Sequence, residues 1–373
     1  MRTAGIVCEY NPFHLGHQYQ IQKTREILGE DTAIVCLMSG NYVQRGEPAV
    51  FDKWTRAAAA VQGGADLVLE NPITTAVNAA GHFASGAVKY LEKLGCIEYL
   101  SFGSECGDLE KLKTTASILN STEFEAALAE QMSTGVSYAA ARTLALHKLG
   151  GDSEVLKTPN NALAIEYLRT LDQLDSSTIP LTIPRDMSLA SASTIRENLG
   201  QWKNNLPNGE QYENTPVHTL ENGEKAMLAV LRTLPHEAFQ NMAFEAEGLW
   251  SKVLKACRRE NSVQDIIMSC KSKRYAFSRL RRTLLCLYLG LDAEKMTWEA
   301  PYLRVLAFNE RGRAVLRQAG DGIPLVSGPI PKTEAAKAYF ELENRATDLY
   351  GLFAPEGVRE PRDREKAHRP VIL

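Results

Sequence analysis

Two histidines separated by a leucine and a glycine stand near the start of the chain, in the segment Asn11-Pro12-Phe13-His14-Leu15-Gly16-His17. The apolar run 4–8 before them predicts a buried strand, and the helix-forming residues 18–28 follow. The histidines therefore belong to a strand-to-helix corner, where the free N–H groups of the first helical turn suit a phosphate. Their imidazoles can donate hydrogen bonds to the oxygens of an α-phosphate as charge develops there.

Two other interpretations of His14 and His17 compete with phosphate binding. Histidines near a turn can be ordinary hydrogen-bonded groups of the core or the surface. A metal site is the other alternative, but two histidines are too few ligands, and no nearby Cys or His cluster in the sequence completes a set. Their position directly after the first predicted strand favours a nucleotide site.

A second group of hydroxyl and cationic side chains is the segment Ser191-Ala192-Ser193-Thr194-Ile195-Arg196, where a helix is expected to begin. Its hydroxyls and N–H groups can bind the outer phosphates of a nucleotide, and Arg196 can stabilise a departing pyrophosphate. A capped helix with an exposed arginine is the alternative for this segment taken alone.

The loop after the second predicted strand, residues 39–48, is the third candidate. It contains glycine, serine, asparagine and an arginine, which together can hold a carboxylate or a phosphate. An ordinary surface turn is the alternative. Lys53, near the start of the next predicted helix, is a further candidate beside a simple N-cap role for Asp52.

The elements that must position these groups alternate along the first half of the chain. Short β-branched apolar runs predict strands at 4–8, 32–38, 65–70 and 97–102, and helices are expected between them. This alternation is typical of a parallel α/β sheet with right-handed crossovers. Ligands of such sheets bind beyond the carboxyl ends of the strands, where the candidate loops lie.

Composition limits the class of protein. The 373 residues allow about two domains, and the net charge of −3 excludes a wholly basic nucleic-acid binder, so any such role must be local. Seven cysteines without a Cys-x-x-Cys pair argue against a disulfide framework or a zinc ribbon and fit a reducing cytoplasm. No secretory signal and no membrane-spanning run is found, so we expect a cytoplasmic protein with no membrane partner.

The segment 11–17 resembles the HxGH motif of the nucleotidyltransferase superfamily. The longer strings Glu9-Tyr10-Asn11-Pro12-Phe13-His14 and Met38-Ser39-Gly40-Asn41-Tyr42-Val43-Gln44-Arg45-Gly46-Glu47-Pro48-Ala49 are similar to the bacterial tRNA(Met) cytidine acetate ligase family. The resemblance implies a Rossmann-like catalytic domain that activates acetate with ATP as acetyl-adenylate. It also implies acetyl transfer to the wobble cytidine of elongator tRNA(Met), giving N(4)-acetylcytidine. Mg²⁺ is expected from ATP chemistry.

The same resemblance carries over site residues position by position. Catalytic roles fall to His14, His17 and Arg196, and the substrate loop comprises Ser39, Gly40, Asn41, Arg45 and Lys53. The residues expected to bind ATP are Val7, Cys8, Glu9, Tyr10, Asn11, Pro12, Phe13, His14, Leu15, Gly16, His17, Gln18, Tyr19, Gln20, Gly103, Asn160, Arg185, Ser191, Ser193, Thr194 and Arg196. The family carries a longer stretch between its counterparts of Arg185 and Ser191 than the residues 186–190 found here.

The second half of the chain is predicted to be helical and locally basic. We expect a catalytic domain at 1–200, a polar linker at 201–223 and a helical tRNA-binding domain at 224–373. The segment 252–282 contains ten Lys and Arg residues and only two acidic residues. Basic residues interleaved with aromatics suit an RNA backbone, although a solvated helix face is the alternative. The predicted tRNA contacts are Lys271, Lys273, Arg274, Tyr275, Arg279, Arg281 and Arg282.

Two other functions stay open at this point. A nucleotidyltransferase that adenylylates a small phosphorylated acceptor would have the same nucleotide site. A non-catalytic RNA-binding protein with a relic nucleotide fold is the second alternative. No DNA partner is expected. The sequence identifies neither an acetate pocket nor a general base, and it leaves the oligomeric state open.

Overall fold

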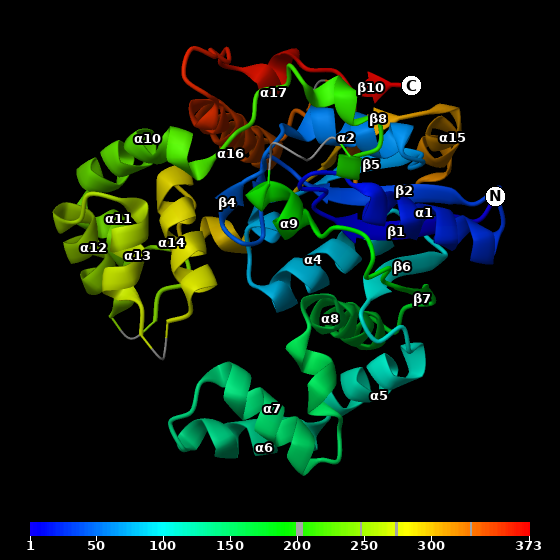
Figure 1. Cartoon of the computed structure of the whole chain (residues 1–373), viewed down its shortest axis with the longest axis horizontal. Coiled ribbons are helices and arrows are strands. Elements are labelled where there is room, and N and C mark those ends of the chain that lie inside the picture. Colours follow the sequence, from blue (N-terminus) through cyan, green and yellow to red (C-terminus); the bar gives the residue numbers. More distant parts are fainter. Residues whose placement is uncertain (199–203, 247, 273–274, 329) are drawn as a thin grey trace.

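The computed structural model describes residues 1–198, 204–246, 248–272, 275–328 and 330–373. Its centre is one twisted sheet in the order β10-β8-β5-β2-β1-β6-β7, with β9 beside β8 (Figure 1). The strands are β1 (Thr3–Cys8), β2 (Ala33–Ser39), β5 (Leu67–Asn71), β6 (Tyr99–Ser104), β7 (Ile179–Pro184), β8 (Leu303–Phe308), β9 (Leu325–Val326) and β10 (Val371–Ile372). The described pairings in this sheet are parallel, apart from the antiparallel pair β5 and β8.

Helices cover both faces of this sheet, which explains the continuous apolar runs of its strands. Helices α1 (Leu15–Leu28) and α2 (Lys53–Gln62) pack on one face, and α4 (Ala80–Lys93) and α8 (Pro159–Gln173) pack on the other. Every residue of β2 is buried, since its alternating side chains enter two different hydrophobic clusters. The predicted parallel α/β architecture is confirmed.

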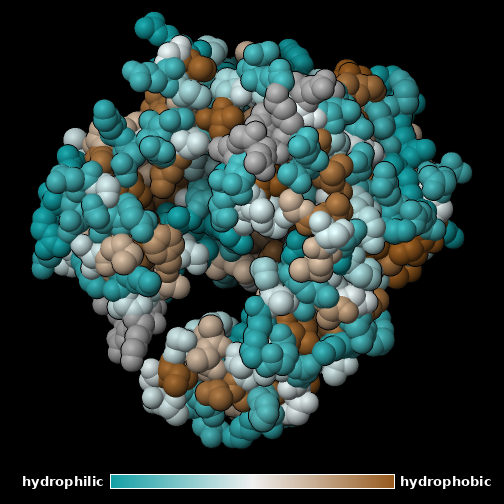
Figure 2. Space-filling model, viewed as in Figure 1, coloured by the Kyte–Doolittle hydropathy of each residue, from teal (hydrophilic) through white to brown (hydrophobic). Residues whose placement is uncertain are grey.

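Two helical parts extend from the sheet. Helices α5 (Leu109–Leu119), α6 (Thr122–Ser133) and α7 (Tyr138–Lys148) continue beyond α8, at the bottom of Figure 1. A bundle at the left comprises α10 (Leu220–Thr233), α11 (His236–Gln240), α12 (Leu249–Arg259), α13 (Val263–Cys270) and α14 (Phe277–Leu289). Figure 2 shows the molecule hollowed between these two parts. No helix in the described ranges is both long and apolar enough to cross a membrane.

The end of the chain returns to the sheet. After the bundle, β8 pairs with β5, and β10 near the C-terminus pairs with β8, while α15 (Glu310–Gln318) packs beside β2 and β5. The predicted unit 224–373 is therefore not one separate helical domain. A six-residue apolar run such as 303–308 fits a buried strand or part of a buried helix equally well, and only its pairing with β5 decides.

A buried ion cluster fixes this returning segment. The ammonium of Lys53 on α2 contacts the carboxylates of Glu70 on β5 and Glu365 on α17 (Arg364–Ala367). Arg304 on β8 lies 3.0 Å from Glu365 and 3.4 Å from Glu343 on α16 (Glu334–Tyr350). Burial alone would lower the pKa of Lys53, but the Glu365 and Glu70 carboxylates raise it. The cluster joins five elements from both ends of the chain.

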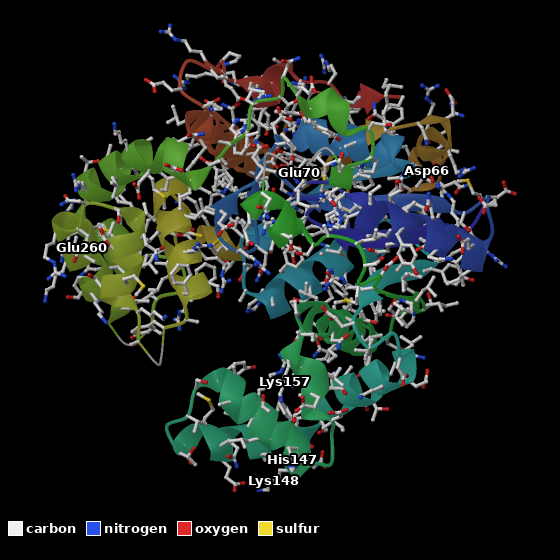
Figure 3. The ribbon with its side chains drawn as sticks, viewed as in Figure 1. Asp66, Glu70, His147, Lys148, Lys157 and Glu260 are labelled. Carbon is white, nitrogen blue, oxygen red and sulfur yellow. The ribbon has the colours of Figure 1, made fainter. Side chains whose placement is uncertain are left out.

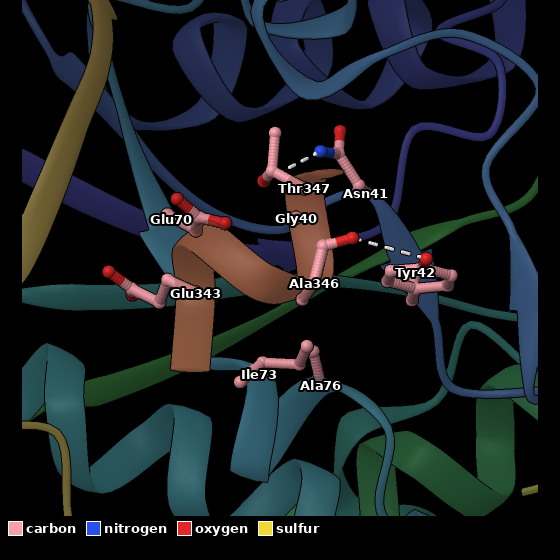
Figure 4. Close-up of a pocket in the computed structure, with 9 residues that line it drawn as sticks. All are labelled: Gly40, Asn41, Tyr42, Glu70, Ile73, Ala76, Glu343, Ala346 and Thr347. Carbon is pink, nitrogen blue, oxygen red and sulfur yellow. Dashed lines mark hydrogen bonds between the residues drawn. The ribbon is translucent and has the colours of Figure 1, made fainter. Parts of the chain in front are cut away.

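A cavity of about 10 Å³ adjoins this ion cluster. Figure 4 shows Glu70 and Glu343 facing it, with the Asn41 amide bonded to the Thr347 hydroxyl at 3.1 Å. This volume matches a single water molecule, and the lining carboxylates would satisfy its hydrogen bonds. The space is too small for a nucleotide.

We predict that Glu365→Ala destabilises the protein strongly. The substitution leaves Lys53 and Arg304 buried with fewer counter-charges, and breaking a buried pair in this way costs about 3–5 kcal/mol. Urea unfolding followed by circular dichroism measures the change. Glu334→Ala is the matched control, because Glu334 on α16 is exposed and forms its ion pair with the exposed Lys337. Equal midpoints for the two variants would contradict the prediction.

Candidate active site

The first turn of α1 is closed by the two histidines of the motif. His14 is the N-cap, and its Nδ1 accepts the N–H of Gly16 at 3.0 Å. Nδ1 of His17 accepts the N–H of His14 at 3.3 Å, which completes a reciprocal capping box. Because both Nδ1 atoms are acceptors, this network assigns the ring proton of each neutral imidazole to Nε2. Each ring therefore keeps one N–H donor that has no partner among the described residues.

Gly16 is required by the same geometry. A Cβ at this position would lie 2.9 Å from Cε1 of the His14 ring, so only glycine lets that ring approach the backbone N–H of residue 16. The two imidazoles stack with ring centroids 3.7 Å apart. The spacing of the motif thus holds both donors side by side.

The surroundings of both histidines favour the neutral form of the ring. Burial, together with the charges of Arg185 and Arg196, lowers the pKa of His14 to about 4. Burial and the neighbouring His14 and Arg185 place the pKa of His17 well below its usual range. The two rings can therefore donate hydrogen bonds to a phosphate without carrying a positive charge themselves.

A cavity of about 590 Å³ opens beside the two rings, at the carboxyl ends of β1, β6 and β7. Such a volume is of the size that holds a nucleotide-sized ligand. The predicted site residues that line it are Val7, Cys8, Glu9, Tyr10, Asn11, His14, Gly16, His17, Tyr19, Gln20, Arg45, Gly103, Asn160, Arg185, Ser191, Ser193 and Arg196. The tertiary structure thus brings the first motif, the second motif and the loop after β2 to one place.

Arg196 joins the second motif to the first. One of its Nη atoms donates to the backbone oxygen of Asn11 at 2.7 Å, and the other donates to the Ser193 hydroxyl at 3.2 Å. Ser191 caps α9 (Ala192–Glu197) by accepting the N–H of Thr194. Desolvation and the nearby Arg45 lower the pKa of Arg196 from its usual value. This guanidinium therefore lies in a site with excess positive charge, which an anion would relieve.

The loop between β6 and α5 is tied to α8. Glu105 accepts hydrogen bonds from the Asn160 amide at 2.7 Å and from Arg185 at 3.4 Å. The short segment 186–190 does not leave the cavity open, because Asp186, Leu189 and Ala190 line it. The loop that is shorter than in the family still contributes to the wall.

Other predicted site residues lie outside the lining of this cavity. Pro12, Phe13, Leu15, Gln18 and Thr194 belong to the same segments but do not face it. Their roles, and those of the remaining loop residues, stay predictions. The loop residues Ser39, Gly40, Asn41 and Lys53 are buried and do not line this cavity.

The structure also adds wall residues that the sequence analysis missed. An apolar surface is formed by Phe83 of α4, Phe102 of β6, and Leu163 and Tyr167 of α8. These residues are far apart in the sequence and have the spacing of ordinary core positions. No local signal could distinguish them from the core.

The basic bundle touches the wall of the same cavity. Arg281 on α14 forms an ion pair with Glu47, and Arg282 donates to the backbone oxygen of Gln44 at 3.5 Å. These partners belong to the hairpin of β3 (Tyr42–Val43) and β4 (Glu47–Pro48). Gly46 has φ +79°, and a Cβ there would lie 2.7 Å from the backbone nitrogen of Arg282. Helix α14 therefore fixes the hairpin that carries Arg45.

Some of the predicted tRNA-binding residues are bonded to other parts of the protein, and one of them is exposed. Arg279 donates to the backbone oxygen of Phe244, and the Tyr275 hydroxyl donates to that of Ala246, so these side chains hold the bundle together. Lys271 is exposed. Lys273 and Arg274 lie outside the described residues.

Comparison with known proteins gives one consistent result. The family model described as HIGH Nucleotidyl Transferase matches residues 1–365. A Thermoanaerobacter protein called tRNA(Met) cytidine acetate ligase is 39% identical, and the match covers 94% of this chain and 95% of that protein. A protein of the same name from Acetivibrio thermocellus is 34% identical, with 94% of each chain covered.

A solved structure also matches this chain over its whole length. The crystal structure of Thermotoga maritima TmcAL bound with alpha-thio ATP has a TM-score of 0.90 and 31% identity, and the match covers 100% of both chains. The apo crystal structure of the same Thermotoga maritima protein matches with the same values. The bundle and the returning strands are thus part of the shared fold, as well as the sheet.

We predict that the rings of His14 and His17 are neutral and protonated on Nε2 at pH 7. Since the pKa of His14 is about 4 instead of the usual 6.5, lowering the pH from 7 to 5 should not protonate it. Long-range ¹H–¹⁵N correlation spectra of the imidazoles measure both properties, and His14→Gln and His17→Gln variants assign the signals. His147 on α7, an exposed residue labelled in Figure 3, provides an imidazole signal from outside the site. Titration of His14 near 6.5 would contradict the prediction.

Proposed function

The chain belongs to the HIGH nucleotidyl transferase family, and within it to the tRNA(Met) cytidine acetate ligases, and from this premise we propose how its own residues carry out the reaction. The enzyme is an ATP-dependent ligase that joins acetate to a cytidine of tRNA. An acetate oxygen attacks the α-phosphorus of ATP, so that an O–P bond forms and pyrophosphate leaves. The cytidine amine then attacks the acetyl carbon, and AMP leaves.

The reciprocal capping of α1 is the observation that carries this proposal. It leaves the Nε2–H groups of His14 and His17 as adjacent, preorganised donors at the cavity. The α-phosphate gains negative charge as the acetate oxygen attacks, and donors that are already in place stabilise that charge more than the ground state. We assign the α-phosphate to these two rings.

The remaining positive charge of the site suits the leaving group. Arg45, Arg185 and Arg196 line the same cavity, and two of them depress the pKa of His14. An arginine at hydrogen-bonding distance of a phosphate forms strong charge-assisted bonds. We propose that Arg196 stabilises pyrophosphate, with the Ser191 and Ser193 hydroxyls beside it, and that Gly103 and Asn160 contact the nucleoside.

Mg²⁺ is the metal expected with ATP. Within the described ranges, no group of three or more His, Cys, Asp or Glu side chains could hold a metal ion. A magnesium ion that accompanies ATP commonly takes phosphate oxygens and water as its main ligands, which fits such a site. We propose that Mg²⁺ bound with ATP would neutralise part of the phosphate charge, and that His14, His17 and Arg196 would contact the phosphates beside it.

The second substrate is a tRNA, and we propose elongator tRNA(Met) with its wobble cytidine as the acceptor. The relatives' name is one support, and the basic bundle beside the active-site hairpin is the other. The hollow between the bundle and helices α5–α7 in Figure 2 is the open face through which a large substrate could approach. We propose a cytoplasmic location, where ATP, acetate and tRNA meet.

We predict that His17→Ala strongly slows the labelling of tRNA from labelled acetate. The protein is incubated with ATP, Mg²⁺ and labelled acetate, with and without bulk bacterial tRNA. Loss of one preorganised donor should lower the rate about 100- to 1000-fold. His147→Ala, at the exposed ring on α7, should keep wild-type activity. Label that enters tRNA only with the wild type and this control supports the proposal.

Other outcomes of this assay would overturn it. ATP consumption without label in RNA would favour an enzyme that adenylylates a small acceptor. Intact ATP together with tRNA binding would leave a non-catalytic RNA-binding protein.

We predict that charge reversal on the bundle weakens tRNA binding. Lys271→Glu removes an exposed cation that is free to meet a phosphate, so affinity should fall several-fold. Filter binding at several salt concentrations measures it, and the magnitude of the salt slope should decrease by roughly 0.7 to 0.9 for one lost phosphate contact. Lys337→Glu on α16 is the matched control and should bind tRNA like the wild type. An unchanged slope for Lys271→Glu would place the RNA elsewhere.

A further inference from the structure

Adenylation of acetate and transfer of the acetyl group differ in whether they need a general base. The inference drawn from this difference rests on the proposed function. Acetate is already ionised at neutral pH, so its attack on ATP has no proton to lose. The exocyclic amine of cytidine must lose a proton when its nitrogen becomes an amide nitrogen. AMP leaves as a phosphate and needs no proton in return. The transfer step therefore has a place for one general base.

Most titratable groups of the cavity cannot serve as that base. His14 and His17 use Nδ1 to accept backbone N–H groups, and Nε2 carries the proton, so the neutral rings have no free acceptor. Burial places the pKa values of Cys8, Tyr10 and Tyr167 above their usual range, which keeps these groups protonated.

Two carboxyl groups remain among the described wall residues. Asp186 accepts hydrogen bonds from the N–H and the hydroxyl of Ser188 through one oxygen, in the loop 186–190, where it stabilises the turn. Glu9 directly follows β1 and lines the cavity beside the paired imidazoles. Of the two, Glu9 comes from the strand end that leads into the catalytic motif.

Hydrogen bonds from other elements of the fold hold Glu9 in position. Its Oε1 accepts the N–H of Gln44 at 2.7 Å, which ties it to the β3–β4 hairpin. Its backbone oxygen accepts from the buried Arg56 of α2 at 2.5 Å. Within the described part of the chain, Oε2 has no hydrogen-bond donor at bonding distance, and the side chain is only half-buried. One carboxylate oxygen is thus held and the other is available.

The charges around Glu9 come from every neighbouring element. Arg196 of α9, Arg45 of the hairpin and Arg56 of α2 are the cations, and the neutral imidazoles of α1 and the phenol of Tyr167 complete the surroundings. Burial raises the pKa of Glu9, while the Gln44 N–H and the three arginines oppose part of that effect. The net rise makes this carboxylate a stronger base than an exposed glutamate.

We propose that Glu9 is the general base of acetyl transfer. As the bond forms between N4 of cytidine and the acetyl carbon, one N4 proton passes to Oε2 of Glu9. The bond between that carbon and the AMP oxygen breaks, and the electron pair leaves with AMP. Glu9 later releases the proton to solvent. The base acts in the second half-reaction only.

The test separates the two half-reactions in a Glu9→Gln variant, which keeps the oxygen that accepts the Gln44 N–H but removes the basicity. Acetate-dependent exchange of labelled pyrophosphate into ATP, without tRNA, measures adenylation together with any effect of the variant on ATP binding, and it should fall far less than transfer does. Single-turnover transfer of labelled acetyl to tRNA should slow by about 100- to 10,000-fold. Glu26→Gln on the exposed end of α1 is the control and should leave both steps unchanged.

The pH profile of transfer provides the second readout. The wild-type rate should rise tenfold per pH unit on the acidic limb, because the base must be ionised, and the Gln variant should lose this slope. Glu9→Asp keeps a carboxylate and should keep the slope at a lower rate. These results would separate a base from a group that only holds the hairpin.

Three results would overturn the proposal. Transfer by Glu9→Gln at the wild-type rate, or with the wild-type slope, excludes Glu9 as the base. Loss of pyrophosphate exchange in the same proportion as transfer assigns Glu9 to the first step or to the hairpin. Absence of acetate-dependent exchange in the wild type refutes the proposed function itself, independently of Glu9.

Discussion

Reciprocal hydrogen bonding between two histidines and the first turn of α1 is the interaction on which the active site depends. It satisfies backbone N–H groups that a helix start would otherwise leave free. The same bonds choose the ring tautomer, hold the rings in a stack and direct the remaining N–H groups away from the backbone. The same two side chains thus cap the helix and provide the donors for the phosphate. Residue 16 must be glycine because the His14 ring occupies the space that a side chain there would need.

Contacts from distant parts of the chain also constrain the geometry of the active site, which lies at the corner between β1 and α1. Arg196 bonds to the backbone of Asn11, and α14 holds the hairpin that carries Arg45. The buried cluster around Lys53 fastens the C-terminal segment to the same sheet. A basic bundle that contacts tRNA would therefore touch the hairpin of the ATP site directly. This gives a short physical route between substrate binding and the geometry of the cavity.

Basic residues in this protein have two different uses, and charge alone does not separate them. Arg281, Arg282 and Arg279 are committed to a carboxylate or to backbone oxygens, where their planar guanidinium groups suit fixed geometry. Lys271 is exposed and has a flexible stem. Sequence composition identifies the basic segment, but the internal partners decide which cations remain for RNA.

The sequence by itself determined the parallel α/β sheet, the corner with His14 and His17, and the family, because strand periodicity and the HxGH spacing are local properties of the chain. It also located the second motif at Ser191–Arg196. Tertiary structure alone decided that residues 303–308 form a strand of the same sheet, since that run has no partner until β5 is in place. It decided that Lys53 lies buried among carboxylates, that Phe83, Phe102 and Tyr167 form a wall of the cavity, and that Glu9 meets Gln44. These are contacts between residues far apart in the sequence, and no local pattern records which side chains the fold will bring together.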